Sequence, residues 1–207
     1  MLKANLLGID VYHGDGNINW SQVSSHSPSI SFAYLKSSES TTSVDPLFKI
    51  NRSAAAAVGI TTGAYHFYHA DVDPIKQAEF FCNQIGSVAS YEIAPCCDFE
   101  ISALPSGKTK HQSQADLLLF LQTIETTLGV KPIIYTNYNS WVYILGEPNF
   151  ASSGYRLWIA DYSSSPRLFG GWTEWSIWQY TGSGTVSGVP NAGGTDVNYY
   201  NWSSAII

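Results

Sequence analysis

The order of apolar segments predicts an α/β fold built on a parallel sheet. Short apolar segments alternate with helical segments over roughly the first 145 residues, and three more strand-like segments follow with little helix between them. Strand–helix alternation produces parallel strands joined by right-handed crossovers. Eight such strands can close into a barrel, and an open doubly wound sheet is the competing topology.

Eight segments are expected to be strands because each is short, apolar and bounded by turn-forming residues. They are residues 6–11, 30–35, 60–67, 91–100, 132–136, 156–162, 175–181 and 195–199.

Helices are expected where an N-terminal signal precedes a run with helical spacing. Asp45-Pro46 and Asp73-Pro74 each begin such a run, and these runs end near residues 57 and 85. Residues 112–128 carry one continuous apolar face and are followed by Gly129, a usual helix stop. Residues 137–145 are expected to form a shorter helix.

Length and composition favour one domain over residues 1–207 that binds a neutral ligand. The 207 residues are 44% hydrophobic and 14% aromatic, which is enough for a large core. Ten Lys and Arg against sixteen Asp and Glu give a net charge of −6, so a nucleic acid is a poor partner. Few charges together with many Trp and Tyr residues suit a sugar better.

The sequence also predicts where the protein is made and in what state its thiols are. No apolar run approaches the ~20 residues that span a bilayer, and residues 1–5 show no signal-peptide pattern. We therefore expect synthesis in the cytoplasm and no membrane insertion. Cys82, Cys96 and Cys97 are odd in number and lack metal-site spacing, so buried thiols in a reducing compartment are expected.

Acidic residues fall at the ends of the predicted strands, within otherwise apolar segments. In a βα barrel the carboxyl ends of the strands form one rim, which carries the active site. Burying a carboxylate there is costly unless it has a partner or a function. The acids expected on this rim are Asp10, Glu39, Asp98, Glu100, Asp161 and Asp196.

Asp98 and Glu100 form the pair with the most specific chemistry. Residues i and i+2 of a strand point to the same side, about 6.5–7 Å apart at the alpha carbons. Two neighbouring carboxylates raise each other's pKa, so one can remain protonated as a general acid while the other is ionised. Glycoside hydrolysis requires this division of roles. A solvated loop at the end of a strand is the alternative explanation.

Aromatic residues are expected on the same rim, where sugar rings could stack on them. These residues include Tyr65, Phe67, Tyr135, Trp158 and Trp178. A metal site at His66-x-x-His69 with Asp71 and Asp73 is a weaker hypothesis, because this spacing at a strand end brings two imidazoles together poorly. We expect neither a metal nor a cofactor.

The chain resembles the family 25 glycoside hydrolases, the Ch-type lysozymes, which include many phage endolysins. Motifs that match occur in order over nearly the whole chain. They are Gly8-Ile9-Asp10-Val11, Ile18-Asn19-Trp20, Lys36 with Glu39, Asp45-Pro46, Gly63-Ala64-Tyr65-His66-Phe67, Asp98-Phe99-Glu100, Pro132-Ile133-Ile134-Tyr135-Thr136, Leu157-Trp158-Ile159-Ala160-Asp161-Tyr162, Trp178-Gln179-Tyr180 and Asp196-Val197-Asn198.

This resemblance implies a flattened, TIM-like (β/α)5(β)3 barrel with N-acetylmuramidase activity on bacterial peptidoglycan. Glu100 would be the general acid, and Asp98 would orient and stabilise the substrate's 2-acetamido group. Asp10 and Asp196 would complete an acidic floor. The residues expected to bind the sugar are Tyr65, Phe67, Tyr135, Trp158, Asp161, Trp178 and Glu39.

The resemblance to substrate-assisted chitinases at Asp98-x-Glu100 favours retention with acetamido assistance. A monomer is expected. Two alternatives remain: a chitinase-like hydrolase of other amino-sugar polymers, and a barrel that binds glycans without cleaving them.

Overall fold

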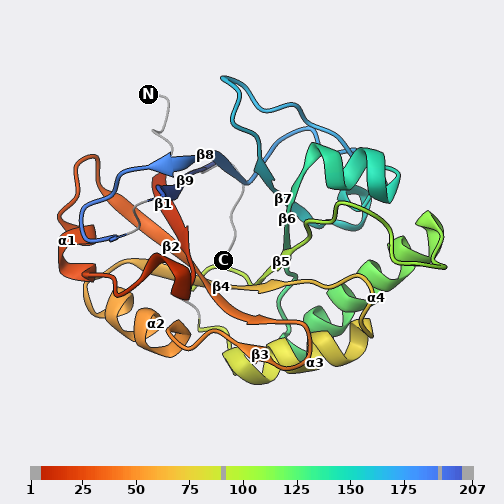
Figure 1. Cartoon of the computed structure of the whole chain (residues 1–207), viewed down its shortest axis with the longest axis horizontal. Coiled ribbons are helices and arrows are strands. Elements are labelled where there is room, and N and C mark those ends of the chain that lie inside the picture. The colour runs from red at the N-terminus through yellow and green to blue at the C-terminus, as the bar shows by residue number, and fades with distance from the viewer. Residues whose placement is uncertain (1–5, 90–91, 191–192, 202–207) are drawn as a thin grey trace.

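The computed structural model describes residues 6–89, 92–190 and 193–201, and it has a barrel at its centre (Figure 1). The strands pair in the order β1-β9-β8-β7-β6-β5-β4-β2, and pairing of β1 with β2 closes the ring. Strand β3 is a short addition at the end of β2. The predicted barrel is confirmed, and the open-sheet alternative is wrong. The strands are β1 (Leu6–Val11), β2 (Ile30–Glu39), β3 (Ser43–Val44), β4 (Thr61–Phe67), β5 (Cys96–Asp98), β6 (Ile133–Asn137), β7 (Arg156–Ala160), β8 (Ile177–Gly184) and β9 (Thr195–Tyr200).

Helices follow the first five barrel strands, as the (β/α)5(β)3 pattern predicts. Figure 1 shows α2, α3 and α4 along one side of the barrel, whereas β8 and β9 form the opposite side. The α-helices are α1 (Trp20–Ser24), α2 (Phe48–Ala57), α3 (Pro74–Ile85) and α4 (Lys110–Leu128). A π-helix, Asn139–Leu145, follows β6, and two 3-10 turns cover His13–Asp15 and Ala151–Ser153.

Side-chain caps fix where helices α3 and α4 begin. The side chain of Asp73 caps α3 by accepting a hydrogen bond from the backbone N–H of Lys76, with Pro74 in the first turn as predicted. Helix α4 begins two residues earlier than predicted, because Thr109 and Gln112 cap each other's backbone N–H groups.

The fourth predicted strand, residues 91–100, was too long at both ends. Only Cys96–Asp98 is a strand, and Tyr91 lies outside the described residues. Pro95 has no N–H to donate to a ladder, and Glu92 instead pairs with Arg52 at 2.6 Å. After Asp98 the backbone N–H of Phe99 still bonds to Tyr135. Glu100 therefore lies just beyond the strand, at the rim of the barrel.

Strand β9 runs antiparallel to both of its neighbours, unlike the other seven barrel strands. The described residues between β8 and β9 contain no helix, and a parallel strand needs a long crossover connection. Reversal of the chain places the start of β9, with Asp196, at the carboxyl ends of the parallel strands. Asp196 therefore reaches the predicted rim from the opposite strand direction.

Two apolar layers hold the barrel together. The interior layer includes Phe32, Tyr34 and Cys96, whereas Cys97 belongs to the layer between the barrel and its helices. Adjacent cysteines thus point to opposite faces of the strand, as predicted. Cys82, Cys96 and Cys97 are buried free thiols. Among the described residues, no helix is long and apolar enough to cross a membrane.

Candidate active site

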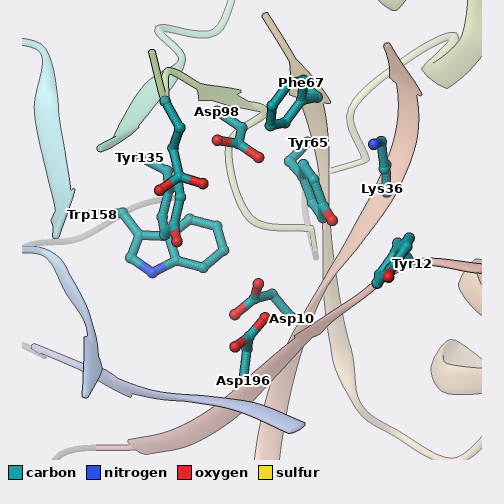
Figure 2. A pocket seen from close by; sticks show the side chains of 10 residues that line it. Asp10, Tyr12, Lys36, Tyr65, Phe67, Asp98, Tyr135, Trp158 and Asp196 are labelled. Carbon is teal, nitrogen blue, oxygen red and sulfur yellow. The ribbon is translucent and has the colours of Figure 1, made fainter. Parts of the chain in front are cut away.

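A pocket with a volume of about 200 Å³ opens at the carboxyl ends of the parallel strands (Figure 2). Eight of the residues predicted for the site line it, and Tyr12 and Lys36 complete the lining. The lining residues are Asp10, Tyr12, Lys36, Tyr65, Phe67, Asp98, Glu100, Tyr135, Trp158 and Asp196. We call this cavity the acid pocket.

Asp10 and Asp196 lie side by side because β1 and β9 pair in a register that opposes these two residues. Figure 2 shows their carboxylates together on one side of the pocket, across from Asp98. Asp10 accepts hydrogen bonds from Gln179 Nε2 at 3.0 Å and Asn198 Nδ2 at 2.8 Å. Burial, followed by the neighbouring Asp196 charge, raises the pKa of Asp10 well above its ordinary value. The pKa of Asp196 is raised to about 6, mainly by burial.

Asp98 and Glu100 form the second pair of acids. Asp98 is buried, and its Oδ1 has no hydrogen-bond partner among the described residues. Its pKa is raised by burial first, and then by the charges of Glu100 and Asp10. Glu100 is half-buried, and its Oε1 accepts a hydrogen bond from Asn137 Nδ2 at 2.8 Å. Burial also raises the pKa of Glu100, which favours the protonated form that a general acid needs.

Among the described residues that line the pocket, Lys36 is the one lysine or arginine. Its Nζ lies 2.6 Å from the carboxylate of Glu39, and 5.0 Å from the centre of the Phe67 ring. Nε2 of His69 lies 2.8 Å from the other oxygen of the Glu39 carboxylate. The charge of Lys36 partly opposes the rise in the pKa of Asp98. Glu39 therefore holds the ammonium group of Lys36 in place and does not itself line the pocket.

Asp161 and Trp178, two other predicted site residues, do not line the pocket either. The carboxylate of Asp161 accepts hydrogen bonds from the backbone N–H groups of Ser163 and Arg167, and so fixes the loop after β7. The neighbours of Trp178 on strand β8, Ile177 and Gln179, are buried, and Trp178 points to the opposite face of the strand. There its ring packs against Trp175, Tyr180 and Tyr199. Its Nε1 donates to the backbone oxygen of Asp161. The strand alternation explains why its ring is not in the pocket.

Sequence analysis missed the amide side chains that hold the acids. Gln179 and Asn198 are buried and bond to Asp10, and Asn137 bonds to Glu100. A signal was present for Asn198, because it lies two residues from Asp196 on the same strand and must share its face.

His66 and His69 do not form a common site. His66 is buried between the rings of Phe81 and Phe120, with its Nδ1 2.9 Å from Ser38 Oγ. His69 lies at Glu39 instead. Over the described part of the chain, no three His, Cys, Asp or Glu residues are grouped so that they could hold a metal ion.

The geometry agrees with what the chain is similar to. A family model described as "Glycosyl hydrolases family 25" matches residues 9–189. The chain belongs to this family. The protein is therefore a glycoside hydrolase of the lysozyme type.

Other proteins similar to this family 25 chain have related functions. Lysozyme M1 of Streptomyces globisporus is 32% identical, covering 96% of this chain and 68% of that protein. The solved bacterial lysozyme from Streptomyces coelicolor is 31% identical with a TM-score of 0.87, and covers 96% of this chain and 93% of its own. A muramidase from Trichobolus zukalii is 28% identical with a TM-score of 0.83, covering 95% and 93% of the two chains.

Replacing Asp196 with Asn is expected to stabilise this family 25 fold at neutral pH. The pKa of Asp196 is raised to about 6 in the folded protein, above its value of about 4 in an unfolded chain. Below pH about 4 the carboxyl is neutral in both states and burying it carries no charge penalty. As the pH rises through 6 the buried carboxyl becomes charged, and the fold loses stability. We expect a gain of about 1 kcal/mol at pH 7.5 after allowing for partial exposure, and none near pH 4. Urea unfolding at both pH values measures it.

Asp161→Asn is the matched control. Its carboxylate accepts backbone hydrogen bonds, which lower its pKa, so this substitution should reduce stability at pH 7.5. A loss of stability in Asp196→Asn at pH 7.5 would contradict the assigned cost of burying that charge.

Proposed function

We propose that the acid pocket hydrolyses the β-1,4 bond between N-acetylmuramic acid and N-acetylglucosamine in bacterial peptidoglycan. The observation that carries the proposal is the placement of Asp98 and Glu100 together in a pocket where burial raises the pKa of both. Similarity to proteins named lysozyme and muramidase supports this choice of substrate.

Glu100 is proposed as the general acid. A carboxyl group that gives a proton to the leaving oxygen must be protonated near neutral pH, and partial burial of Glu100 favours that form. The hydrogen bond from Asn137 fixes its Oε1, which leaves the other oxygen to face the substrate. As the bond from the anomeric carbon to the oxygen breaks, the proton of Glu100 moves to that oxygen.

Asp98 is proposed to act on the substrate's 2-acetamido group. The acetamido oxygen forms a bond to the anomeric carbon as the leaving oxygen departs, and the amide nitrogen becomes positively charged. Oδ1 of Asp98, which has no hydrogen-bond partner within the described part of the chain, accepts a hydrogen bond from the amide N–H and stabilises this charge. Water then attacks the anomeric carbon and gives a proton to Glu100 as the bond from that carbon to the acetamido oxygen breaks, so the configuration at the carbon is retained.

The rest of the lining is proposed to hold the reacting sugar. Asp10 and Asp196 offer oxygens to its hydroxyl groups from the floor, and Tyr65, Phe67, Tyr135 and Trp158 provide ring surface around it. Glu39 acts through Lys36. Asp161 and Trp178 act on the rim by fixing the loop after β7. We propose that a single chain suffices, and that it acts on the cell wall after synthesis in the cytoplasm.

Mass spectrometry of digested peptidoglycan tests the bond that is cleaved. A muramidase releases fragments with muramic acid at the reducing end. Reducing-end N-acetylglucosamine, or activity on chitin alone, would favour the chitinase-like alternative instead. Binding of the wall without any release of fragments would favour the non-catalytic barrel, although grouping four buried or half-buried carboxyls gives little advantage to a protein that only binds.

The pH dependence of kcat gives a second test. Activity should fall on the alkaline side as Glu100 loses its proton, and a flat profile between about pH 4 and 9 would contradict its role. Because the hydrogen bond from Asn137 favours ionised Glu100, removing it in Asn137→Ala should move the alkaline limb to higher pH. A limb that stays fixed or moves to lower pH would show that another group controls it.

A further inference from the structure

A hollow opens at the end of the barrel opposite the acid pocket, where strands β5, β6 and β7 begin. We call it the basal hollow; its walls are Ala94, residues 129–133 between α4 and β6, Gly154 and Arg156. Its volume of about 420 Å³ is more than twice the 200 Å³ of the acid pocket. The basal hollow is therefore large enough for a ligand of its own, away from the reacting sugar.

The charged side chains that line the basal hollow are both cations. They are Lys131 and Arg156, and no Asp or Glu is among the described residues of its lining. The chain as a whole carries a net charge of −6, so this grouping is opposite in sign to its average composition. A hollow lined in this way attracts an anion.

Arg156 points toward the barrel interior at the amino ends of the strands. It is the first residue of β7 and shares a strand face with Trp158, which lines the acid pocket. Its partner in the ladder is Ile133, a member of the interior apolar layer. Arg156 also borders a neighbouring hollow that Glu174 lines, but the two residues form no ion pair. Its side chain therefore lies between the apolar interior and the basal hollow.

Arg156 differs from the other two arginines of the chain in its lack of a partner. Arg52 pairs with Glu92 at 2.6 Å, and the guanidinium carbon of Arg167 lies 3.2 Å from the centre of the Tyr138 ring. The side chain of Arg156 is half-buried and makes no hydrogen bond or ion pair with any residue that the structure describes. Partial burial of an unpaired charge costs stability, so the fold itself does not explain an arginine here. An anion in the hollow would supply the partner.

Lys131 is fixed at the edge of the basal hollow by its neighbours. Its Nζ donates to the backbone oxygen of Ser153 at 2.8 Å and lies 4.6 Å from the centre of the Tyr155 ring. The carboxylate of Glu125, which is not part of the lining, lies 3.3 Å from the same nitrogen and balances part of its charge. A ligand thus meets one ammonium group already in place, and the guanidinium of Arg156 is the principal cation.

We propose that the basal hollow binds a phosphate group, and that this phosphate belongs to a phosphodiester polymer of the cell wall. A guanidinium presents its N–H donors in a planar fork that matches phosphate oxygens, and an ammonium adds a point charge beside it. A phosphate group has enough oxygens to bond to both cations at once, whereas a carboxylate has fewer. The apolar part of the lining, which includes Val130 and Pro132, suits the carbon chain of a polyol phosphate.

The choice of the wall as the source rests on the proposed function. Many bacterial walls carry polyol-phosphate chains that are linked covalently to the peptidoglycan that the acid pocket is proposed to cleave. Because the basal hollow and the acid pocket lie at opposite ends of the same strands, a phosphate chain and a glycan strand can occupy them together. Binding at the basal hollow then raises the local concentration of glycan at the acid pocket.

Isothermal titration calorimetry of the full chain with a glycerol-phosphate oligomer tests the site itself. We expect the unchanged protein to bind the oligomer and Arg156→Gln to bind it at least about 10-fold more weakly, because charge-assisted hydrogen bonds from the guanidinium are lost. Lys49→Gln is the matched control. Lys49 is exposed on α2 and lines neither the acid pocket nor the basal hollow, and its substitution removes the same unit of charge. Its affinity for the oligomer should be unchanged.

Wall digestion tests the use of the site. Release of reducing ends is compared on walls that carry the polymer and on the same walls after hydrofluoric acid has removed it. We expect the KM of Arg156→Gln to rise at least about 3-fold on the polymer-bearing walls and to match that of the unchanged protein on the stripped walls. Full cleavage of the stripped walls also shows that the variant is folded.

Unchanged affinity in Arg156→Gln, or an equal loss of affinity in Lys49→Gln, would overturn the proposal. So would inorganic phosphate that binds as tightly as the oligomer, because the hollow would then hold free phosphate and not a wall polymer. Displacement of the oligomer by polyglutamate at the same concentration would show a general attraction for anions, and would also overturn it. Failure of the proposed function is separate: it would show as full cleavage of stripped walls by Glu100→Gln, which leaves the calorimetry unaffected.

Discussion

Glu100→Gln is expected to lower kcat on purified cell walls by about 10³-fold, within the range that general acid catalysis contributes. The amide preserves the size of the side chain and can still bond to Asn137, but it cannot supply a proton to the leaving oxygen. Binding of the glycan should change little, because the lost interaction belongs to the transition state. Release of reducing ends over time measures the rate.

The control for this variant is Glu125→Gln on α4. Glu125 bonds to Tyr155 and pairs with Lys131 away from the acid pocket, so the same chemical change there should leave kcat unaltered. Near-normal lysis by Glu100→Gln would remove Glu100 from the mechanism. An equally large fall in Glu125→Gln would show that the assay responds to stability and not to acid catalysis.

Asp98→Asn is expected to lower kcat by about 10²–10³-fold, similar to the loss of one preorganised electrostatic partner. The amide nearly matches the carboxylate in shape, but it carries no charge to stabilise the positive acetamido intermediate. Reducing ends released from purified cell walls over time give the rate.

Asp73→Asn serves as the matched control for Asp98→Asn. Asp73 caps α3, and asparagine is an equally good cap, so both stability and activity should be retained. If Asp98→Asn kept its full rate on purified cell walls, the acetamido group would not depend on Asp98.

The barrel could be predicted from the sequence because the local helix and strand signals agree with the overall topology. Asp73-Pro74 begins a helix, Gly129 ends one, and the helices cease after the fifth unit, as the structure confirms. Sequence alone did not indicate the antiparallel β9, because strand direction depends on the connection and not on the composition of the strand. The fourth strand was predicted too long because residues 93–95 are apolar and buried without belonging to the strand ladder.

For the site, positions at strand ends were more informative than residue type. Asp10, Asp98, Glu100 and Asp196 could be placed because each follows or lies on an apolar strand. The ring of Trp178 lies outside the acid pocket because Trp178 alternates with Gln179, and residue type does not reveal this because aromatic residues suit both faces of a strand. Lys36 and Asn137 lacked a signal, because their roles depend on side chains from other strands.

Because β9 closes the ring beside β1, the acid pocket joins Asp10 to Asp196, which lie far apart in the sequence. A ribosome that has not yet passed residue 196 carries a chain with an open cylinder and one of the four acids missing. A chain cut before residue 196 is therefore expected to have no muramidase activity, even if every other strand folds.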